Sequence, residues 1–226
     1  MLTFIQNDPE VPAGSLALNL PCPHIIHHPY RDGFLPEPED VSALIVLGGA
    51  MGANDDGQHP FLTGLKSLIR KLVAAGVPYL GVCLGGQILS AALGGEVVSH
   101  RWGERGASKI TLTPAGSADP LFRGIPQEFT MFQWHDDSFD LPPGAVLLAA
   151  SPVCPHQAFR MGDCAWGLQF HPEVDERIIV DWAARDPKHA GLTESLLADW
   201  QRTRDGYCRA SQTMLKNFLS VSGLWS

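Results

Sequence analysis

The stretch Tyr79–Gln87, YLGVCLGGQ, decides the fold and contains the first candidate for chemistry. Its apolar start predicts a short buried strand, and the run that begins at Gly85 predicts a helix to Leu93. Cys83 therefore lies at a sharp turn, where the glycines permit backbone angles and close approaches that a Cβ would forbid. The turn exposes the sulfur beyond the sheet, and the helix N-terminus favours the thiolate. The pattern Gly-x-Cys-x-Gly is a nucleophile elbow with sulfur in place of oxygen.

A nucleophilic cysteine needs a base, and the stretch GLQFHPE at residues 167–173 supplies a candidate. The apolar strand would bring His171 to the edge of the sheet, while Pro172 restricts its backbone and holds Glu173 close to the imidazole. Cysteine, histidine and carboxylate supply nucleophile, base and orienting group. Read separately, Cys83 could be a structural core residue. His171 could be satisfied in a loop, and Glu173 could be an N-terminal helix charge. Together, these residues predict catalysis.

Short apolar runs alternate with helical patterns around the elbow, which favours a mostly parallel sheet covered by helices. Strands are predicted at residues 43–47 and 79–82, and helices at 60–73 and 85–93. From residue 109 no long helix separates the predicted strands, which indicates a mixed or antiparallel section. Those strands are expected at 109–113, 129–133, 145–149, 157–161 and 165–170. Helices are expected near 174–185, 193–204 and 209–220, whereas five prolines between residues 21 and 38 leave little room for a long first helix.

Composition excludes several classes of protein. The 226 residues carry 24 acidic and 16 basic side chains, a net charge of −8, which argues against a general nucleic-acid binder and against an anionic membrane surface as partner. The sequence shows neither a signal peptide nor the roughly 20 apolar residues of a membrane span. We therefore expect a single cytoplasmic domain over residues 1–226.

Cysteine and histidine spacing predicts neither a disulfide framework nor a metal site. The five cysteines are scattered and odd in number, so at least one thiol is free. Cys22 with the nearby histidines matches no standard zinc spacing, and Cys154 with His156 has no partner motif. We expect no metal and no cofactor. Trp182 and Trp200 lie on apolar helical faces and are expected in the core.

These motifs resemble the class I glutamine amidotransferase family, whose signature is a G-x-C-x-G elbow with a downstream H-P-E. The resemblance extends from Ala43 to about Val174 and includes the glycine loop Leu47–Met51. Phe132–His135 and Phe139–Gly144 are similar to standalone members related to the amidotransferase domain of GMP synthase. The resemblance implies a flavodoxin-like three-layer sandwich. It also implies hydrolysis of glutamine to glutamate and ammonia through a γ-glutamyl thioester on Cys83.

The resemblance also implies roles by position. Gly49 and Leu84 would supply the oxyanion N–H groups, and Gln87 would touch the amino-acid part of the substrate. Further substrate-binding candidates are Gly48, Trp134, His135 and Asp136. Asp136 departs from the family, which has a small residue there. Its carboxylate would either repel the α-carboxylate of glutamine, by about 1–4 kcal/mol at ~4 Å, or point outward.

Three functions fit these residues. The first is a glutaminase. Because no synthase domain fits within this chain, either its ammonia passes to a separate synthase subunit or hydrolysis itself is the purpose. The second is a γ-glutamyl peptide hydrolase on the same scaffold, and the third is a catalytically silent module that binds a partner. The presence of all three triad residue types counts against the third.

Overall fold

The structure is a computed structural model that describes residues 1–185 and 190–225. Within these residues a nine-stranded sheet runs in the order β2-β1-β3-β4-β11-β10-β9-β6-β7. The first five strands are parallel and the remaining neighbours are antiparallel. The bounds are β1 (Leu2–Ile5), β2 (His24–His27), β3 (Ala43–Val46), β4 (Tyr79–Val82), β6 (Glu104–Leu112), β7 (Glu128–His135), β9 (Val146–Ala150), β10 (Ala158–Met161) and β11 (Ala165–Leu168). A separate antiparallel pair joins β5 (Val97–Val98) to β8 (Ser138–Phe139).

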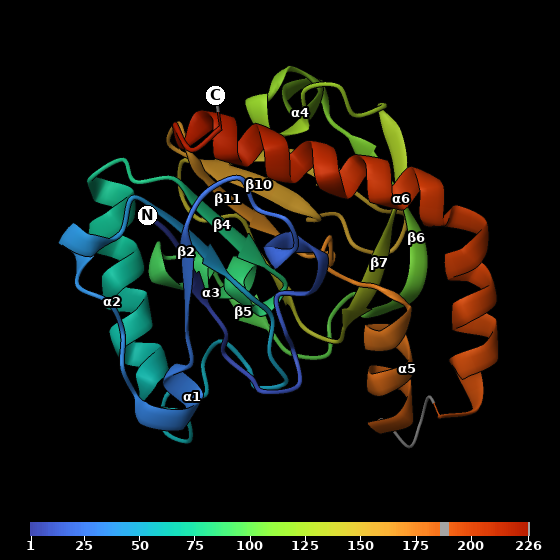
Figure 1. Cartoon of the computed structure of the whole chain (residues 1–226), viewed down its shortest axis with the longest axis horizontal. Helices are drawn as coiled ribbons and strands as arrows, with labels where there is room; N and C mark the ends of the chain where they lie inside the picture. The colour runs from blue at the N-terminus through green and yellow to red at the C-terminus, as the bar shows by residue number, and fades with distance from the viewer. Residues whose placement is uncertain (186–189, 226) are drawn as a thin grey trace.

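Helices cover both faces of the sheet and make three layers (Figure 1). Successive side chains of a strand point to opposite faces, so Leu44 and Val46 pack with α2 (Phe61–Ala74) and α3 (Leu84–Ala92), whereas Ile45 packs in the other core. That second core includes α5 (Glu176–Arg185) and α6 (Thr193–Val221). Shorter elements are α1 (Pro29–Asp32), α4 (Pro114–Ala118), η1 (Gly14–Ala17), η2 (Pro38–Asp40), η3 (Pro120–Phe122) and η4 (Ala190–Leu192). The predicted three-layer α/β fold, with its mixed segment, is confirmed.

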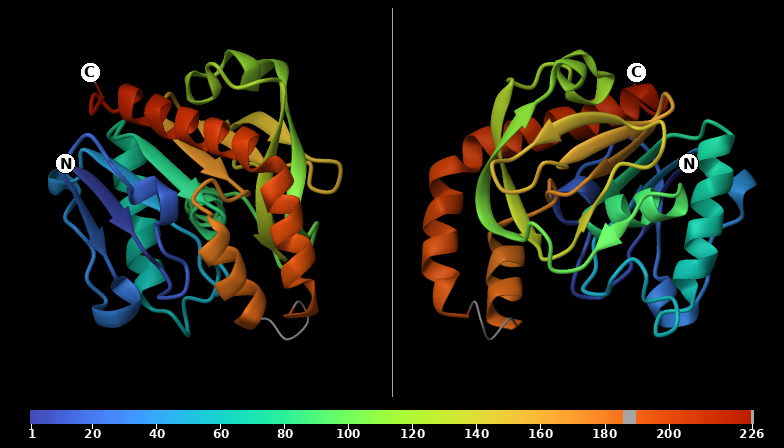
Figure 2. Two further views of the ribbon diagram at one scale, coloured as in Figure 1. Left: turned by 45° about the vertical axis from the view of Figure 1, so that its right-hand side comes forward. Right: turned by 180° about the vertical axis from the view of Figure 1, so that it is seen from behind.

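The C-terminal helices differ from the prediction. Residues predicted as two helices, 193–204 and 209–220, form the continuous helix α6. Gly206 does not end the helix, because a stripe of buried side chains continues past it through Trp200, Tyr207, Met214 and Phe218. The helix changes direction along its length, so that its C-terminal arm lies over the sheet and its N-terminal arm runs beside α5 (Figure 2). Among the described residues no helix is long and apolar enough to cross a membrane.

The N-terminal segment contains two strands that the sequence pattern did not indicate. β1 is fully buried and lies between β2 and β3 in the sheet, while β2 forms its edge. As predicted, no long helix forms in residues 1–40, and the connection from β1 to β2 contains only the short η1. The carboxyl ends of β1, β3, β4 and β11 meet at one edge, where ligands bind in open parallel sheets. The predicted catalytic residues Cys83, His171 and Glu173 lie at or just beyond this edge.

Candidate active site

Cys83 forms the predicted elbow between β4 and α3. Its backbone adopts φ 50° and ψ −106°, a conformation that few residues other than glycine adopt. The flanking glycines make the turn possible, because a Cβ on Gly85 would lie 2.1 Å from the Val46 carbonyl oxygen. A Cβ on Gly81 would lie 2.4 Å from the carbonyl of Gly85. The helix therefore crosses the strand ends at a distance that only glycine allows, and strain at Cys83 is held by this packing.

His171 and Glu173 form a buried pair at the end of β11. Nδ1 of His171 lies 2.6 Å from Oε1 of Glu173, and the side chains are 3% and 0% exposed. Burial alone would lower the pKa of His171. The charges of Glu173 and Cys83 outweigh burial and raise this pKa to about 10. Nε2 of His171 has no hydrogen-bond partner among the described residues. The ring is therefore oriented by the carboxylate and presents its second nitrogen to the site.

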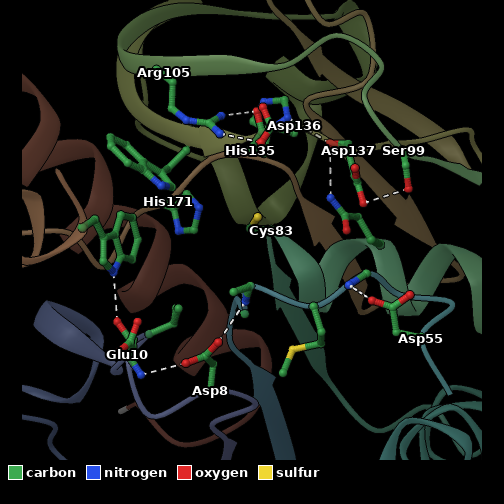
Figure 3. A pocket seen from close by; sticks show the side chains of 18 of the residues that line it. Asp8, Glu10, Asp55, Cys83, Ser99, Arg105, His135, Asp136, Asp137 and His171 are labelled. Carbon is green, nitrogen blue, oxygen red and sulfur yellow. Dashed lines mark hydrogen bonds and ion pairs between the residues drawn. The ribbon is translucent and has the colours of Figure 1, made fainter. Parts of the chain in front are cut away.

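The structure brings Cys83 and His171 together, although 88 positions separate them in the chain. A Cβ built on Gly48 would lie 3.3 Å from Cε1 of His171 and 3.8 Å from Cβ of Cys83, so both side chains flank this one glycine. Both line a cavity of about 570 Å³ (Figure 3). Gly48 therefore lies beside both nucleophile and base, and a side chain there would crowd the imidazole.

The two predicted oxyanion donors lie next to each other, beside the nucleophile. A Cβ on Gly49 would approach Cδ2 of Leu84 to 2.8 Å, so the glycine loop packs directly on the first residue of α3. Within the described part of the chain, no hydrogen bond consumes the N–H of either residue. The next N–H in the loop, that of Ala50, donates to Oδ2 of Asp8 at 3.0 Å. Asp8 thus fixes the loop from β1 and leaves the Gly49 donor for a ligand.

The proposed substrate-binding residues surround the other side of the sulfur. Gln87 is buried and donates from Nε2 to the carbonyl of Asp137 at 3.3 Å. Nδ1 of His135 contacts the same carbonyl at 3.0 Å, so this imidazole both lines the cavity and fixes the loop that follows β7. Trp134 lies on the cavity wall. Gln87 and His135 thus hold the same carbonyl, and all three residues line the cavity that contains Cys83.

Asp136 lies at the rim of the cavity with its side chain partly in solvent, so neither of its two predicted orientations describes it fully. Its carboxylate lies 2.7 Å from Nη2 of Arg105, and its side chain is 60% exposed. Arg105 also donates to the carbonyl of His135 and lies over the Trp134 ring at 5.1 Å. The charge of Asp136 is thereby paired at the rim of the cavity (Figure 3).

Hydrogen bonds from distant segments fix the backbone of His171–Glu173. The hydroxyl of Tyr207 on α6 donates to the carbonyl of His171 at 2.8 Å and accepts from the N–H of Val174 at 2.9 Å. The N–H of Ser15 donates to the carbonyl of Glu173 at 2.9 Å. The base is therefore held by elements near both ends of the sequence.

Several residues of the site were not predicted. Trp182 was expected in the core, and although it is buried it also lines the cavity, with its ring 4.9 Å from the His171 ring in an edge-to-face arrangement. Its indole N–H donates to the carbonyl of Glu10 at 2.9 Å. Core and cavity-wall residues share the same helical periodicity, so the sequence held no signal for this role. For Asp8 and Arg105 the one available signal was position: Asp8 follows the end of β1, and Arg105 lies at the start of β6.

The described residues contain no cluster of three or more potential metal ligands, and all five cysteines are free thiols in the structure. Cys83 is the cysteine that lines the cavity.

Comparison with known proteins agrees with this geometry. Residues 24–178 match the family described as Glutamine amidotransferase class-I. The chain is 33% identical over 141 residues to the glutamine amidotransferase-like protein YfeJ of Salmonella typhimurium, an alignment that covers 61% of this chain and 59% of YfeJ. It is 37% identical over 142 residues to one subunit of the glutamine-hydrolyzing GMP synthase of Thermococcus kodakarensis, covering 60% of this chain and 71% of that protein. The alignment with the GMP synthase of Thermomicrobium roseum spans only 26% of that protein.

A solved structure extends the likeness over nearly the whole chain. The glutamine amidotransferase of Methylobacillus flagellatus superposes with a TM-score of 0.83 and 28% sequence identity, covering 97% of this chain and 94% of that one. Fold, elbow and family match therefore agree, and the chain belongs to the class I glutamine amidotransferase family.

Proposed function

We propose that this protein hydrolyses the side-chain amide of glutamine to glutamate and ammonia. The observation that carries the proposal is that Cys83 and His171 line the same cavity, while Nδ1 of His171 is hydrogen-bonded to Oε1 of Glu173 at 2.6 Å. Nucleophile, base and orienting carboxylate are the set that covalent amide hydrolysis requires. Family membership supports the same chemistry.

The reaction proceeds in two halves. Sγ of Cys83 attacks the amide carbon, the carbonyl oxygen becomes an oxyanion held by the N–H groups of Gly49 and Leu84, and His171 protonates the departing ammonia. A γ-glutamyl thioester on Cys83 remains. Water, deprotonated by His171, then attacks the thioester, so that glutamate leaves and the thiol is restored. Glu173 keeps the imidazole oriented throughout both halves.

The direct test is to incubate the isolated protein with glutamine and measure glutamate and ammonia. We expect the two products in equal amounts, and no turnover after Cys83→Ser. Mass spectrometry after exposure to a glutamine-analogue diazoketone should show one adduct, on Cys83, that is absent from the variant. A protein that neither turns over glutamine nor takes up the adduct would instead be the silent partner-binding module.

The volume of the cavity leaves room for a second candidate, hydrolysis of γ-glutamyl peptides. About 570 Å³ lies within the range of roughly 300–1,000 Å³ typical of whole small-molecule sites. The rim carries Arg105 and Arg185, which would exchange their present partners, Asp136 and Glu10, for the carboxylate of a longer leaving group. Comparison of kcat/KM for glutamine and for γ-glutamyl dipeptides separates the two activities, since preference for the peptides would reject a dedicated glutaminase.

The destination of the ammonia is also a proposal. One relative belongs to a glutamine-hydrolyzing GMP synthase made of separate subunits, which supports transfer to a separate synthase subunit in this case too. We further propose that residues 1–226 act as one domain, because the contacts that fix His171 come from both Ser15 and Tyr207. We place the reaction in the cytoplasm, where a free nucleophilic thiol persists.

A further inference from the structure

We propose that Gln169 is a further catalytic residue, whose side-chain amide donates a hydrogen bond to the Cys83 thiolate. Nε2 of Gln169 lies 3.7 Å from Sγ of Cys83, and the Gln169 side chain is fully buried. Gln169 therefore touches the reacting atom from the side of the sheet. The inference rests on the proposed function only in taking Cys83 as the nucleophile.

The hydrogen-bond partners of Gln169 fix which end of its amide faces the sulfur. The carbonyl of Asp137 can only accept, so the group of Gln87 that faces it at 3.3 Å is the amide nitrogen. The same nitrogen donates to Oε1 of Gln169 at 3.4 Å. A reversed Gln169 would bring two NH₂ groups face to face, and therefore its own NH₂ group points to Cys83.

The backbone fixes the distance between donor and sulfur. The N–H of Cys83 donates to the carbonyl of Leu168 at 2.8 Å, immediately before Gln169. The N–H of Gln169 donates to the carbonyl of Gln157 at 2.9 Å. Gly86 of α3 lies so close to the same strand that an added Cβ would be 2.6 Å from the Leu168 oxygen. The elbow and the residue after β11 are thus joined rigidly, and the donor is in place before any substrate arrives.

A donor at this position acts on the charged form of the sulfur. A thiolate accepts an N–H hydrogen bond far better than a thiol does, so the amide of Gln169 stabilises the nucleophilic form of the sulfur. The amide of Gln87, a predicted substrate-binding residue, donates to Gln169. Hydrogen bonds therefore connect the predicted substrate-binding residue to the nucleophile through Gln169.

The test is the pH profile of Cys83 alkylation by iodoacetamide, read for this cysteine by peptide mass spectrometry. For Gln169→Leu we expect the midpoint to move to higher pH and the rate at pH 7 to fall by about tenfold or more, the usual scale for a hydrogen bond to a charged group. Gln169→Glu keeps the size of the side chain but removes the donor and adds a negative charge. It should move the midpoint in the same direction and further.

Gln133→Leu is the matched control, because Gln133 is equally buried and its Nε2 bonds Gln157 at 3.0 Å, not the nucleophile. We expect it to lose stability without moving the midpoint. The proposal is wrong if folded Gln169→Leu or Gln169→Glu keeps the wild-type profile, or if Gln133→Leu moves the midpoint as far as Gln169→Leu. Should Gln169→Leu fail to fold, Gln169→Met takes its place, because methionine also lacks a donor and adds no charge. Alkylation needs no substrate, so the inference can fail while glutamine turnover succeeds, and the reverse.

Discussion

Nδ1 of His171 lies 2.6 Å from Oε1 of Glu173, and neither side chain is more than 3% exposed. A buried imidazole on its own would resist protonation, because burial disfavours its charged form. The carboxylate and the nearby sulfur reverse that tendency and raise the pKa of His171 to about 10. The pair therefore makes both the stability and the nucleophile of this protein depend on pH.

Glu173→Gln should change how stability varies with pH. The pKa of His171 in the folded protein, about 10, exceeds its ordinary value of 6.5. Its contribution is complete below pH 6.5 and is lost as pH rises toward 10. In Glu173→Gln the imidazole stays buried but loses the carboxylate, so His171 contributes less to the free energy of unfolding between pH 6.5 and 10. Urea unfolding at pH 6, 7.5 and 9 should show a loss steeper in wild type than in Glu173→Gln, by more than ~1 kcal/mol over the series.

Glu176→Gln is the control for that comparison, because Glu176 is half-exposed near Arg204 at 3.8 Å and such surface pairs contribute little. Its pH profile should follow wild type. Parallel curves for Glu173→Gln and wild type would show that the carboxylate does not set the protonation of His171.

Cysteine labelling should be selective. Cys83 shares its cavity with His171, whereas burial raises the pKa of Cys154 to about 11 and also raises the pKa of Cys164 and of Cys208. At pH 7 iodoacetamide should modify Cys83 first and Cys154 last, as read by peptide mass spectrometry. Equal rates at all five cysteines would contradict an activated thiol.

Asp8→Ala should reduce kcat with little change in KM. Asp8 holds the N–H of Ala50 at 3.0 Å and so fixes the loop that carries the Gly49 donor. Outright loss of an oxyanion donor costs about 10²–10³ in kcat, so displacement of this one should cost at least ~10-fold. Asp55→Ala is the matched control, since Asp55 makes a similar bond to the N–H of Gly52 at 2.7 Å, further along the same loop. Equal losses in both variants would assign the effect to the loop in general.

Gly85→Ala should destabilise the fold. The added methyl would lie 2.1 Å from the Val46 oxygen, a backbone atom that cannot move without shifting β3. Overpacking of this kind costs about 1–3 kcal/mol or more. Gly57→Ala, with nothing within 4 Å of its Cβ, should match wild type in urea unfolding. A stable Gly85→Ala would mean that α3 can retreat from the sheet.

Arg105→Ala should raise KM for glutamine more than the double variant Arg105→Ala with Asp136→Ala does. Arg105 pairs with the Asp136 carboxylate at 2.7 Å, so its removal leaves a free negative charge at the cavity rim. Removing both charges restores neutrality. Steady-state kinetics of the four proteins gives the coupling, and purely additive effects on KM would show that Asp136 does not face the substrate.

The sequence was sufficient for the parts of the fold whose pattern is local. Strand β4 was predicted to its terminal residues, since its apolar run ends at the elbow glycines, and α2 and α3 were placed to within one residue. The strand at residues 109–113 was predicted too short, because β6 begins at Glu104 and the polar and small residues 104–108 break the apolar pattern. β1 was missed although it is fully buried, because Thr3 interrupts its short apolar run and no turn residue precedes it.

The site divides in the same way. Cys83, His171 and Glu173 were predicted because the chemistry confines each to a recognisable local motif, and the structure gathers them in one place; their roles stay a prediction. Trp182 and Asp8 act through contacts with residues distant in the chain, such as Glu10 and Ala50, and no local pattern reports such contacts. Asp136 illustrates both cases. Its charge was evident from the sequence, but its pairing with Arg105, which is distant in the chain, was not.

The hydrogen bonds from Ser15 and Tyr207 to the backbone around His171 set the smallest piece of this protein that can work. A fragment trimmed to residues 24–178, the span that carries the family match, would still contain every signature residue. It would lack β1 and both of those anchors, and the imidazole would lose its fixed position. The segment that contains the motifs is therefore shorter than the segment that catalysis requires. A fragment with the motifs alone is expected to be inactive.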